Sequence, residues 1–415
     1  MTLNANSDGK SVTLAQQAAG GTLSEVPEIF ESRKSDHIRA SMDPSVQSGG
    51  SGFDAFEFVH EALPDLNFNE VSIGSRIFQG TRFETELKSP FFISSMTGGH
   101  KESLRLNEML ASAAAQKGWA MGVGSQRREL GDKTAQDEWR RVRKTAPGAI
   151  LFGNIGISQL IESGPSQVLT LIEALEAKAM IIHLNALQEA LQPEGTPQFR
   201  GGLSAIAELV KMAEAEFAVP VIVKETGCGI SALTASRLFN VGVRVVDVAG
   251  RGGTHWGRIE GLRAARKLEL AATDSEINRL KTLRQAAKAF ENWGLLTAES
   301  LIQVAKVCET GADGHEVWAS GGVRSGIDGA KALRLGAKAV GLAQPILAGA
   351  LESETSLHQV MDHFDYELKT VLFCCGLKDL KAFEAHAILN RVFERASTGG
   401  ASTGGAMSAI KDGLS

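Results

Sequence analysis

Short aliphatic runs alternate with longer segments of helical periodicity across the central part of the chain. Each run is bounded by Gly or Pro, as buried strands often are, whereas apolar residues in the longer segments recur every three or four positions. Strands that alternate with helices in this way predict parallel pairing through crossover helices. The expected strands are residues 90–96, 119–125, 149–156, 179–186, 220–227, 244–250, 316–322 and 339–344.

Helices are expected between these strands. The segments with helical spacing include residues 102–116, 167–177, 203–217, 232–239, 298–308 and 326–335. Eight strands in regular alternation with helices predict an α/β fold of the closed (β/α)8 TIM-barrel type. A doubly wound open sheet is the alternative, but the polar or glycine-rich strand ends favour closure. Residues 251–288 are long for a simple connection and predict an insertion or lid.

The two ends of the chain differ from its centre. Residues 1–28 and 396–415 lack hydrophobic periodicity, and the second of these stretches is rich in Gly, Ser and Thr. Such composition predicts a disordered N-terminal extension and a flexible C-terminal tail. The barrel domain is therefore expected over residues 29–395, with residues 29–88 forming an N-terminal cap segment ahead of the first strand.

Composition and charge exclude several classes of function. The 43 Lys and Arg residues against 48 Asp and Glu give a formal net charge of −5, so no overall basic field attracts nucleic acid or anionic lipid. No stretch approaches the roughly 18 apolar residues that span a membrane, and the N-terminus lacks a secretory signal. The four cysteines include no CxxC pair and suggest no disulfide framework, which favours a reducing cytoplasm.

A phosphate site is expected after the seventh strand. Gly321 and Gly322 precede Val323, Arg324 and an expected helix, and residues 341–343 follow the eighth strand. Glycine lets the backbone approach an anion, a helix start presents N–H groups, and arginine can bind phosphate through two parallel hydrogen bonds. Because barrels build phosphate sites from their last two loops, this placement favours a phosphate site over a plain turn.

Polar side chains also follow the other strands, at the end where barrel enzymes carry their chemistry. Lys224 ends an apolar strand, so its ammonium needs an anionic or electron-rich partner such as a flavin's pyrimidine edge or a phosphate. The Ser-Met-Thr turn at 95–97 and Asn154 suit the same planar ring through hydrogen bonds and a thioether contact. Each of these residues taken alone is equally compatible with turn chemistry.

A second polar cluster follows the strand at 179–186. His183 and Asn185 are two positions apart, so a strand places them on one face, and Gln188 and Glu189 come next on the loop. A lone His is more often structural, but a carboxylate and two amides beside it suggest a hard-cation or diphosphate site. Mg²⁺ typically takes one carboxylate together with substrate phosphates, whereas zinc would need more His or Cys.

Three side chains that can carry positive charge, Arg33, Lys34 and His37, lie ahead of the barrel. Short basic clusters are common on solvated turns, which is the simpler interpretation. The functional interpretation is a clamp for a polyanion that reaches over the barrel mouth.

Taken in order, these motifs resemble those of the type 2 isopentenyl diphosphate isomerases. The motifs are RKSDH, SSMTGG, GVGSQR, GNIG, HLNALQE, VKETGCGIS, DVAGRGGTHW and ASGGVRSGID, and the resemblance runs from Arg33 to about Phe393. It implies an isomerase of isoprenoid biosynthesis that interconverts isopentenyl and dimethylallyl diphosphate on an eight-stranded barrel. It also implies a requirement for reduced FMN and Mg²⁺, NADPH as flavin reductant, and a homotetramer or homo-octamer.

The same resemblance implies roles for individual residues. Those implied to contact FMN or its phosphate are Ser95, Met96, Thr97, Ser125, Asn154, Lys224, Thr254, Gly321, Gly322, Val323, Arg324, Ala343 and Gln344. Those implied to bind the substrate are Arg33, Lys34, His37, Ser125, Arg127, His183, Asn185 and Gln188. Glu189 would bind Mg²⁺, and Gln188 and His183 are the candidate catalytic side chains. His255 and Trp256, a variable pair in the family, receive no catalytic role.

An FMN-dependent oxidoreductase on the same barrel is the alternative function, because fold similarity alone does not separate the two. An α-hydroxy-acid oxidase would want a catalytic His beside an Arg at the seventh strand, where this chain has Ala-Ser-Gly-Gly at 319–322. A nucleotide dehydrogenase with a covalent step would want a mobile Cys, and Cys228 has no adjacent base in sequence. A non-catalytic flavin-binding module would have no reason to keep His183, Gln188 and Glu189 together.

Overall fold

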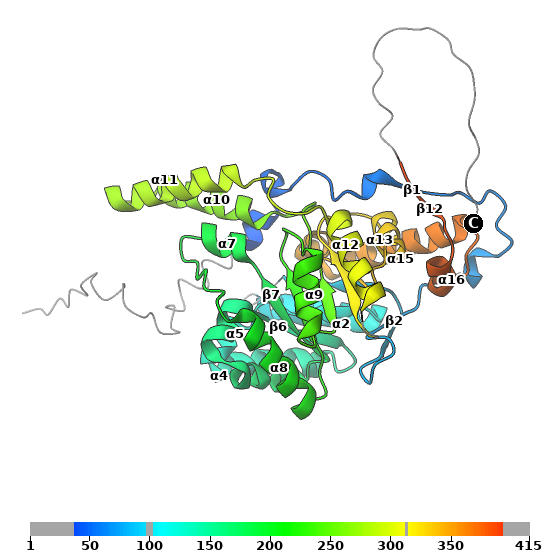
Figure 1. Ribbon diagram of the computed structural model, residues 1–415, viewed down its shortest axis with the longest axis horizontal. Helices are drawn as coiled ribbons and strands as arrows, with labels where there is room; N and C mark the ends of the chain where they lie inside the picture. The colour runs from blue at the N-terminus through cyan, green and yellow to red at the C-terminus, as the bar shows by residue number, and fades with distance from the viewer. Residues whose placement is uncertain (1–36, 97–102, 312–313, 393–415) are drawn as a thin grey trace, which may run out of the picture.

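The computed structural model describes residues 37–96, 103–311 and 314–392 (Figure 1). The expected extension at 1–28 and tail at 396–415 lie outside the described residues, as do Arg33, Lys34 and Thr97. Eight parallel strands close into a barrel in the order β4-β5-β6-β7-β8-β9-β10-β11, and β11 pairs back onto β4. This closure confirms the (β/α)8 TIM barrel and excludes the open sheet.

Each expected strand overlaps one barrel strand. The barrel strands are β4 (Phe91–Ile93), β5 (Ala120–Gly122), β6 (Ile150–Gly156), β7 (Ala179–Leu184), β8 (Val221–Glu225), β9 (Val245–Asp247), β10 (Glu316–Ser320) and β11 (Val340–Leu342). Most are shorter than expected at their C-terminal ends, and Ser94, Asn185 and Gly321 directly follow β4, β7 and β10. Those polar ends all lie at one opening of the barrel.

Helices cover the outside of the barrel (Figure 1). The longer ones are α2 (Ser103–Lys117), α4 (Lys133–Thr145), α6 (Pro165–Leu175), α8 (Gly202–Glu216), α9 (Ala232–Asn240), α12 (Thr297–Thr310), α13 (Gly326–Arg334), α14 (Gln344–Glu352) and α15 (Glu354–Cys374). The shorter ones are α3 (Arg127–Gly131), α5 (Ile157–Ser163), α7 (Ala186–Leu191) and α16 (Leu380–Ala385). All six expected helices are present to within a few residues at each end.

Aromatic side chains fill the N-terminal half of the barrel interior. Trp318 packs against Phe78, Phe92 and Phe152 with ring centroids 5.1–5.6 Å apart, and all four rings are buried. Phe78 follows the first strand of an antiparallel hairpin, β2 (Ser75–Ile77) and β3 (Thr85–Leu87). The hairpin therefore plugs this end of the barrel and leaves the opposite end for a ligand.

The N-terminal segment does more than cap the barrel. Residues 37–41 are helical, and the chain continues through three short 3-10 helices at η2 (Pro44–Val46), η3 (Phe53–Ala55) and η4 (Phe68–Glu70). β1 (Phe56–Phe58) pairs antiparallel with β12 (Leu389–Arg391) near the end of the described chain. The segment thus begins at the barrel mouth and ends at the plugged base.

The long connection at 251–288 forms a helical hairpin, which confirms the expected insertion. Its helices are α10 (Trp256–Leu268) and α11 (Asp274–Ala289), and α10 packs beside α7 at the barrel mouth (Figure 1). Its role as a lid stays a prediction. Within the described part of the chain, no helix has both the length and the apolar character to cross a bilayer.

Candidate active site

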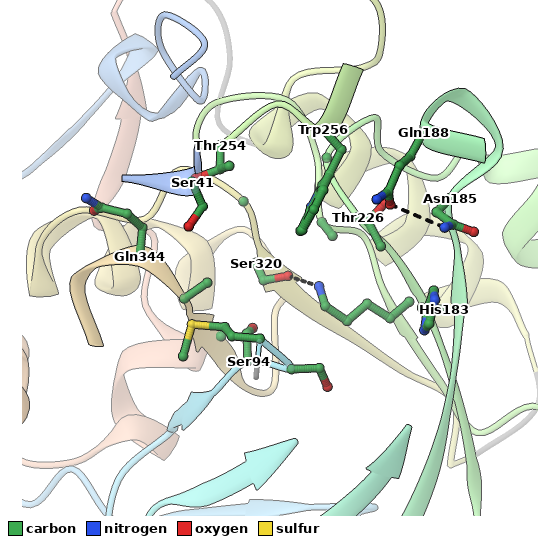
Figure 2. Close-up of a pocket in the computed structure, with 18 of the residues that line it drawn as sticks. Ser41, Ser94, His183, Asn185, Gln188, Thr226, Thr254, Trp256, Ser320 and Gln344 are labelled. Atoms are coloured by element: carbon green, nitrogen blue, oxygen red, sulfur yellow. Dashed lines mark hydrogen bonds between the residues drawn. The ribbon is translucent and has the colours of Figure 1, made fainter. Parts of the chain in front are cut away.

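A pocket lies at the C-terminal ends of the barrel strands, and residues that end or follow all eight strands line it (Figure 2). Every sequence-predicted site residue that the structure describes is part of the lining. These residues are His37, Ser95, Met96, Ser125, Arg127, Asn154, His183, Asn185, Gln188, Glu189, Lys224, Thr254, Gly321, Gly322, Val323, Arg324, Ala343 and Gln344. Figure 2 shows Thr254 and Gln344 on one side of the pocket and His183, Asn185 and Gln188 on the other.

Sequence reasoning missed part of the lining. The additional residues are Ile38, Ser41, Ser94, Gln159, Gln192, Thr226, Gly227, Ala249, Trp256 and Leu347. Most of them adjoin predicted site residues in the chain. Trp256 had been set aside as one of a variable pair, yet its ring lines the pocket and meets the ring of His37 edge-on, with centroids 5.2 Å apart. Its position at the start of α10, just after the loop that follows β9, was the available signal.

His255, by contrast, has a structural role. Its Nδ1 accepts a hydrogen bond from the backbone N–H of Arg258 and caps α10, and its Nε2 donates to the carbonyl of Trp293 at 3.2 Å. Burial lowers the pKa of His255 below its usual value, so the ring is neutral at neutral pH, as this pair of bonds requires.

Lys224 has an anionic partner inside the protein, where the sequence had suggested only a ligand. It pairs in register with Asp247 across β8 and β9, and its Nζ lies 3.0 Å from Asp247 Oδ2. Nζ also donates to Ser320 Oγ at 2.6 Å, the bond drawn as a dashed line at Ser320 in Figure 2. Ser320 Oγ in turn donates to Asp247 Oδ1 at 2.7 Å. Asp247 is only 1% exposed, whereas Lys224 and Ser320 line the pocket. The carboxylate therefore fixes the ammonium at the pocket floor.

His183 is held by a neighbouring amide. Its Nδ1 lies 3.0 Å from Asn154 Oδ1, and since an amide oxygen only accepts, Nδ1 is the donor. In the neutral ring the acceptor nitrogen is then Nε2. Asn154 itself lies at the end of β6 and is 4% exposed, so this contact fixes both the orientation and the tautomer of the imidazole.

The Glu189 carboxylate is buried and hydrogen-bonded at both oxygens. Asn185 Nδ2 donates to Oε1 at 2.8 Å, and the backbone N–H of Thr196 donates to Oε2 at 2.7 Å. Among the described residues, no group of three or more His, Cys, Asp or Glu side chains could hold a metal ion. A hard cation at this position would therefore take one carboxylate from the protein and its other ligands from a phosphorylated substrate and water.

Glu260 joins three elements behind this side of the pocket. Its Oε1 lies 2.9 Å from His37 Nε2 and accepts from Gln188 Nε2 at 3.3 Å, while Arg263 Nη1 donates to Oε2 at 2.6 Å. Burial opposes ionisation of Glu260, but the contacts with His37 and Arg263 lower its pKa below the usual value. An ionised carboxylate on the inserted α10 thus orients two predicted site residues. Sequence reasoning missed it because an acidic residue inside an amphipathic helix looks like a solvated one.

The loops after β10 and β11 have the backbone that a phosphate site requires. Gly321 and Gly322 have φ of 98° and 73°, and a Cβ at either would lie 2.3 Å from the backbone of Gly250 or Gly252. These glycines are therefore required by packing between loops as well as by any approach to an anion. Arg324 follows them at the pocket rim.

Two serine hydroxyls at the end of β4 support the presence of a polar ligand. Ser94 Oγ and Ser95 Oγ are buried and have no hydrogen-bond partner among the described residues, although both serines line the pocket. Buried hydroxyls are rarely left unsatisfied, so a ligand with hydrogen-bonding groups at its edge would complete them. A planar heteroaromatic ring system with a phosphate tail fits these residues together with the glycine loops.

The buried carboxylate of Glu225 gives a prediction about stability. Burial raises its pKa from the usual 4.5 to about 7, despite hydrogen bonds from the backbone N–H groups of Cys228, Gly227 and Thr226. The folded state therefore holds this proton more tightly than the unfolded state, and the contribution of Glu225 to stability falls as pH rises from 4.5 to 7. Glu225→Gln stays neutral and keeps an acceptor oxygen. Between pH 4.5 and 7 the ionisation of Glu225 should lower the free energy of unfolding of the wild type by about 3 kcal/mol, and Glu225→Gln should not show this decrease.

Urea unfolding at pH 5 and pH 8 measures the difference. Glu162→Gln, the same change at an exposed position of α5, serves as the matched control and should follow the wild-type pH dependence. Parallel pH dependences for Glu225→Gln and the wild type would show that Glu225 does not take up a proton on folding.

Comparison with known proteins places this geometry in a family. The model of the FMN-dependent dehydrogenase family matches residues 198–390. The isopentenyl-diphosphate delta-isomerase of Bdellovibrio bacteriovorus is 47% identical over 361 residues, which cover 87% of this chain and 98% of that protein. Proteins of the same name from Legionella pneumophila strain Paris and Methanoregula boonei are 47% and 42% identical, covering 85% and 83% of this chain and 96% and 89% of their own length.

Solved structures of a lactate oxidase and of flavocytochrome b2 share the fold. A putative lactate oxidase from Pediococcus acidilactici gives a TM-score of 0.59 at 17% identity, covering 88% of this chain and 94% of its own. A flavocytochrome b2 variant with bound sulfite gives 0.61 at 17% identity, covering 96% and 97%. Identity this low shows the barrel fold alone. The curated relatives are far more similar in sequence and match over most of both chains, so the chain belongs to the family of FMN-dependent, type 2 isopentenyl-diphosphate delta-isomerases.

Proposed function

We propose that the protein interconverts isopentenyl and dimethylallyl diphosphate by flavin-assisted proton transfer in isoprenoid biosynthesis. One observation supports this most directly: in a chain of this family, the residues expected to hold FMN and those expected to hold a diphosphate line the same pocket. The reaction moves a double bond, so one proton is added at the terminal alkene carbon. Another proton is removed from the carbon next to the one that bears the diphosphate. No net oxidation takes place.

The cofactor side of the pocket comprises the ends of β4, β8, β10 and β11. We propose that Lys224 and the Ser94 and Ser95 hydroxyls contact the ring, and that Arg324 and the glycine loop at Gly321 and Gly322 hold the phosphate; all of these residues line the pocket. When bound and reduced, FMN supplies an electron-rich ring face and a ring nitrogen that can exchange a proton. The protein's part is to orient this ring and to exclude competing chemistry.

The substrate side comprises the ends of β5 and β7, α7 and the helical stretch at 37–41. His37, Arg127, His183 and Asn185 are proposed to hold the diphosphate, and Glu189 is proposed to hold the Mg²⁺ that neutralises it. Arg33 and Lys34, outside the described residues, are proposed to complete the clamp. Anchoring the diphosphate here directs the five-carbon chain toward the middle of the pocket.

Gln188 and His183 are proposed as the side chains that line the reacting carbons. Gln188 is fixed at both ends of its amide, because Oε1 accepts from Asn185 Nδ2 at 3.2 Å and Nε2 donates to Glu260. His183 is fixed by Asn154 in one tautomer. Both therefore present defined donors and acceptors, which is what positioning a proton transfer requires.

The match to the FMN-dependent dehydrogenase family model and the shared fold are compatible with the oxidoreductase alternative, but the residues of the pocket do not favour it. At the mouth of β10 the pocket presents Ser320, Gly321 and Gly322, where an α-hydroxy-acid oxidase would need its catalytic His. Burial raises the pKa of the Cys228 thiol to about 12, so it stays protonated and is a poor nucleophile for a covalent dehydrogenase mechanism.

An anaerobic assay tests the proposal. Protein reconstituted with FMN, reduced with dithionite and supplied with MgCl₂ and isopentenyl diphosphate should form dimethylallyl diphosphate until the two reach equilibrium, with no consumption of reductant per turnover. Oxidised FMN under the same conditions is the control and should give little product. Failure to form product with reduced flavin, together with oxidation of lactate or mandelate by the oxidised form, would favour the oxidase alternative.

NADPH as the flavin reductant, a cytoplasmic location and a homotetramer or homo-octamer are also proposed on the strength of the family. Light scattering during size-exclusion chromatography measures the assembly, and stopped-flow bleaching of the flavin by NADPH measures the reductant.

A further inference from the structure

Residues 41–52 are hydrogen-bonded to the loop that follows β9. Gln47 forms an antiparallel bridge with Thr254, and the backbone N–H of Ser48 donates to the carbonyl of Gly253 at 2.7 Å. The N–H of His255 donates to the carbonyl of Val46 at 2.9 Å. Arg258 Nη1 donates to the carbonyl of Gln47 at 2.6 Å. The backbone of Gln47 is therefore fixed beside the barrel mouth.

The side chain of Gln47 has one orientation available to it. Its Nε2 donates to the carbonyl of Ser41 at 3.0 Å and to Thr254 Oγ1 at 3.3 Å. Because a carbonyl can only accept, the NH₂ group must face Ser41, and the amide oxygen then faces the other way. That oxygen accepts from Arg324 Nη2 at 2.7 Å.

The hydrogen bond from Arg324 to the Gln47 amide oxygen is of the kind that can orient an anion-binding arginine. A neutral amide oxygen orients the guanidinium without neutralising its charge, whereas a carboxylate would do both. Arg324 has a carboxylate close by, since its backbone N–H donates to Asp328 Oδ2 at 3.0 Å. Without Gln47 the guanidinium can turn toward Asp328 and away from the pocket.

We propose that Gln47 is a positioning residue that holds the Arg324 guanidinium over the glycine loop, and thereby sets the affinity of the site for the phosphate monoester of the cofactor. The inference rests on the proposed function, because it takes FMN as the ligand on this side of the pocket. Gln47 acts chiefly through Arg324; its longer contact with Thr254 Oγ1, at 3.3 Å, is expected to have only a small effect on recognition of the ring.

Binding of FMN and of riboflavin to the flavin-free protein tests this inference, because riboflavin has the same ring and no phosphate. Quenching of flavin fluorescence measures both dissociation constants. Gln47→Ala should weaken FMN about 10-fold and riboflavin less than about twofold. Gln47→Glu, which neutralises Arg324, should weaken FMN about 100-fold with the same small effect on riboflavin. Gln116→Ala, on the outer helix α2, is the matched control and should leave both constants unchanged.

One further variant and the wild-type result distinguish failure of this inference from failure of the proposed function. Arg324→Ala should reduce the preference for FMN over riboflavin at least as much as Gln47→Ala does, which tests the phosphate contact itself. If the wild type binds neither flavin, the proposed function fails and this inference fails with it. If the wild type prefers FMN but Gln47→Ala weakens both flavins equally, or neither, only the role of Gln47 is wrong.

Arg324 could instead bind the diphosphate of the substrate. A calorimetric titration of the FMN-loaded protein with inorganic pyrophosphate tests this alternative. Gln47→Ala should leave this binding unchanged. Weaker pyrophosphate binding with an unaltered preference for FMN would assign Arg324 to the substrate and overturn the inference. Thermal unfolding of each flavin-free variant, with a midpoint equal to that of the wild type, confirms that the comparison concerns folded protein.

Discussion

Replacing Lys224 by Met is expected to destabilise the flavin-free protein by about 3–5 kcal/mol, because the change leaves a buried carboxylate without its counter-ion. Asp247 is 1% exposed and lies 3.0 Å from the ammonium that would be removed. Ser320 Oγ and the backbone N–H of Ala249 would remain as donors to Asp247 Oδ1, but two neutral groups do not replace a cation. The loss follows from desolvated charge and not from lost packing, since Met preserves most of the side-chain volume.

A second change identifies the cause. Asp247→Asn in the Lys224→Met background removes the orphaned charge, so the double variant should recover most of the lost stability. Urea unfolding of the flavin-free proteins gives the free energies. Lys211→Met, at an exposed position of α8, is the matched control and should change stability by less than about 0.5 kcal/mol. A Lys224→Met variant as stable as the wild type would contradict the assignment of a buried ion pair.

The double variant also separates stability from cofactor binding. If Lys224 contacts the flavin as proposed, the double variant should be folded and stable yet bind FMN more weakly than the wild type. Absorbance of the retained flavin after gel filtration measures this. Wild-type flavin retention in a double variant of recovered stability would limit Lys224 to a structural role.

The fold could be predicted from the sequence because the barrel strands are short, mainly apolar runs, most of which end in polar residues or glycine. In a parallel barrel such ends all meet at one opening, so the predicted residues after β4, β6, β7 and β10 had to lie near one another. Local pattern and overall architecture agree here, as they do in sequences that specify one fold.

The residues that support the site could not be predicted in the same way. Asp247 lies in the aliphatic run RVVDVAG, and its pairing with Lys224 arises from the register between β8 and β9, which no local pattern displays. Glu260 and Gln47 lie in segments outside the strand–helix repeat, and their contacts join residues more than 70 positions apart. Strand ends therefore indicate which residues face a ligand, but not which residues hold them in place.

The largest effect on activity is expected for Glu189→Gln, which should lower kcat/KM for isopentenyl diphosphate by about 100-fold and leave FMN bound. Loss of a metal-ligating carboxylate removes several kcal/mol of interaction with the cation, and each 1.36 kcal/mol is about tenfold in rate. The Mg²⁺ concentration for half-maximal rate should rise as well. Initial rates over a range of MgCl₂ concentrations, with the flavin spectrum as a check on occupancy, provide the measurement.

A structural explanation for the same loss must be separated from a metal-binding one, because Glu189 also anchors its own loop. Glutamine has a single acceptor oxygen, so either Asn185 Nδ2 or the N–H of Thr196 would lose its partner. If the loss stems from metal affinity, a large excess of Mg²⁺ should restore part of the rate. If it stems from a displaced loop, Mg²⁺ should restore nothing. No other carboxylate lines the described pocket, so no other side chain of this kind could replace Glu189 as the ligand. Full activity of Glu189→Gln at the wild-type Mg²⁺ requirement would therefore exclude Glu189 as the metal ligand.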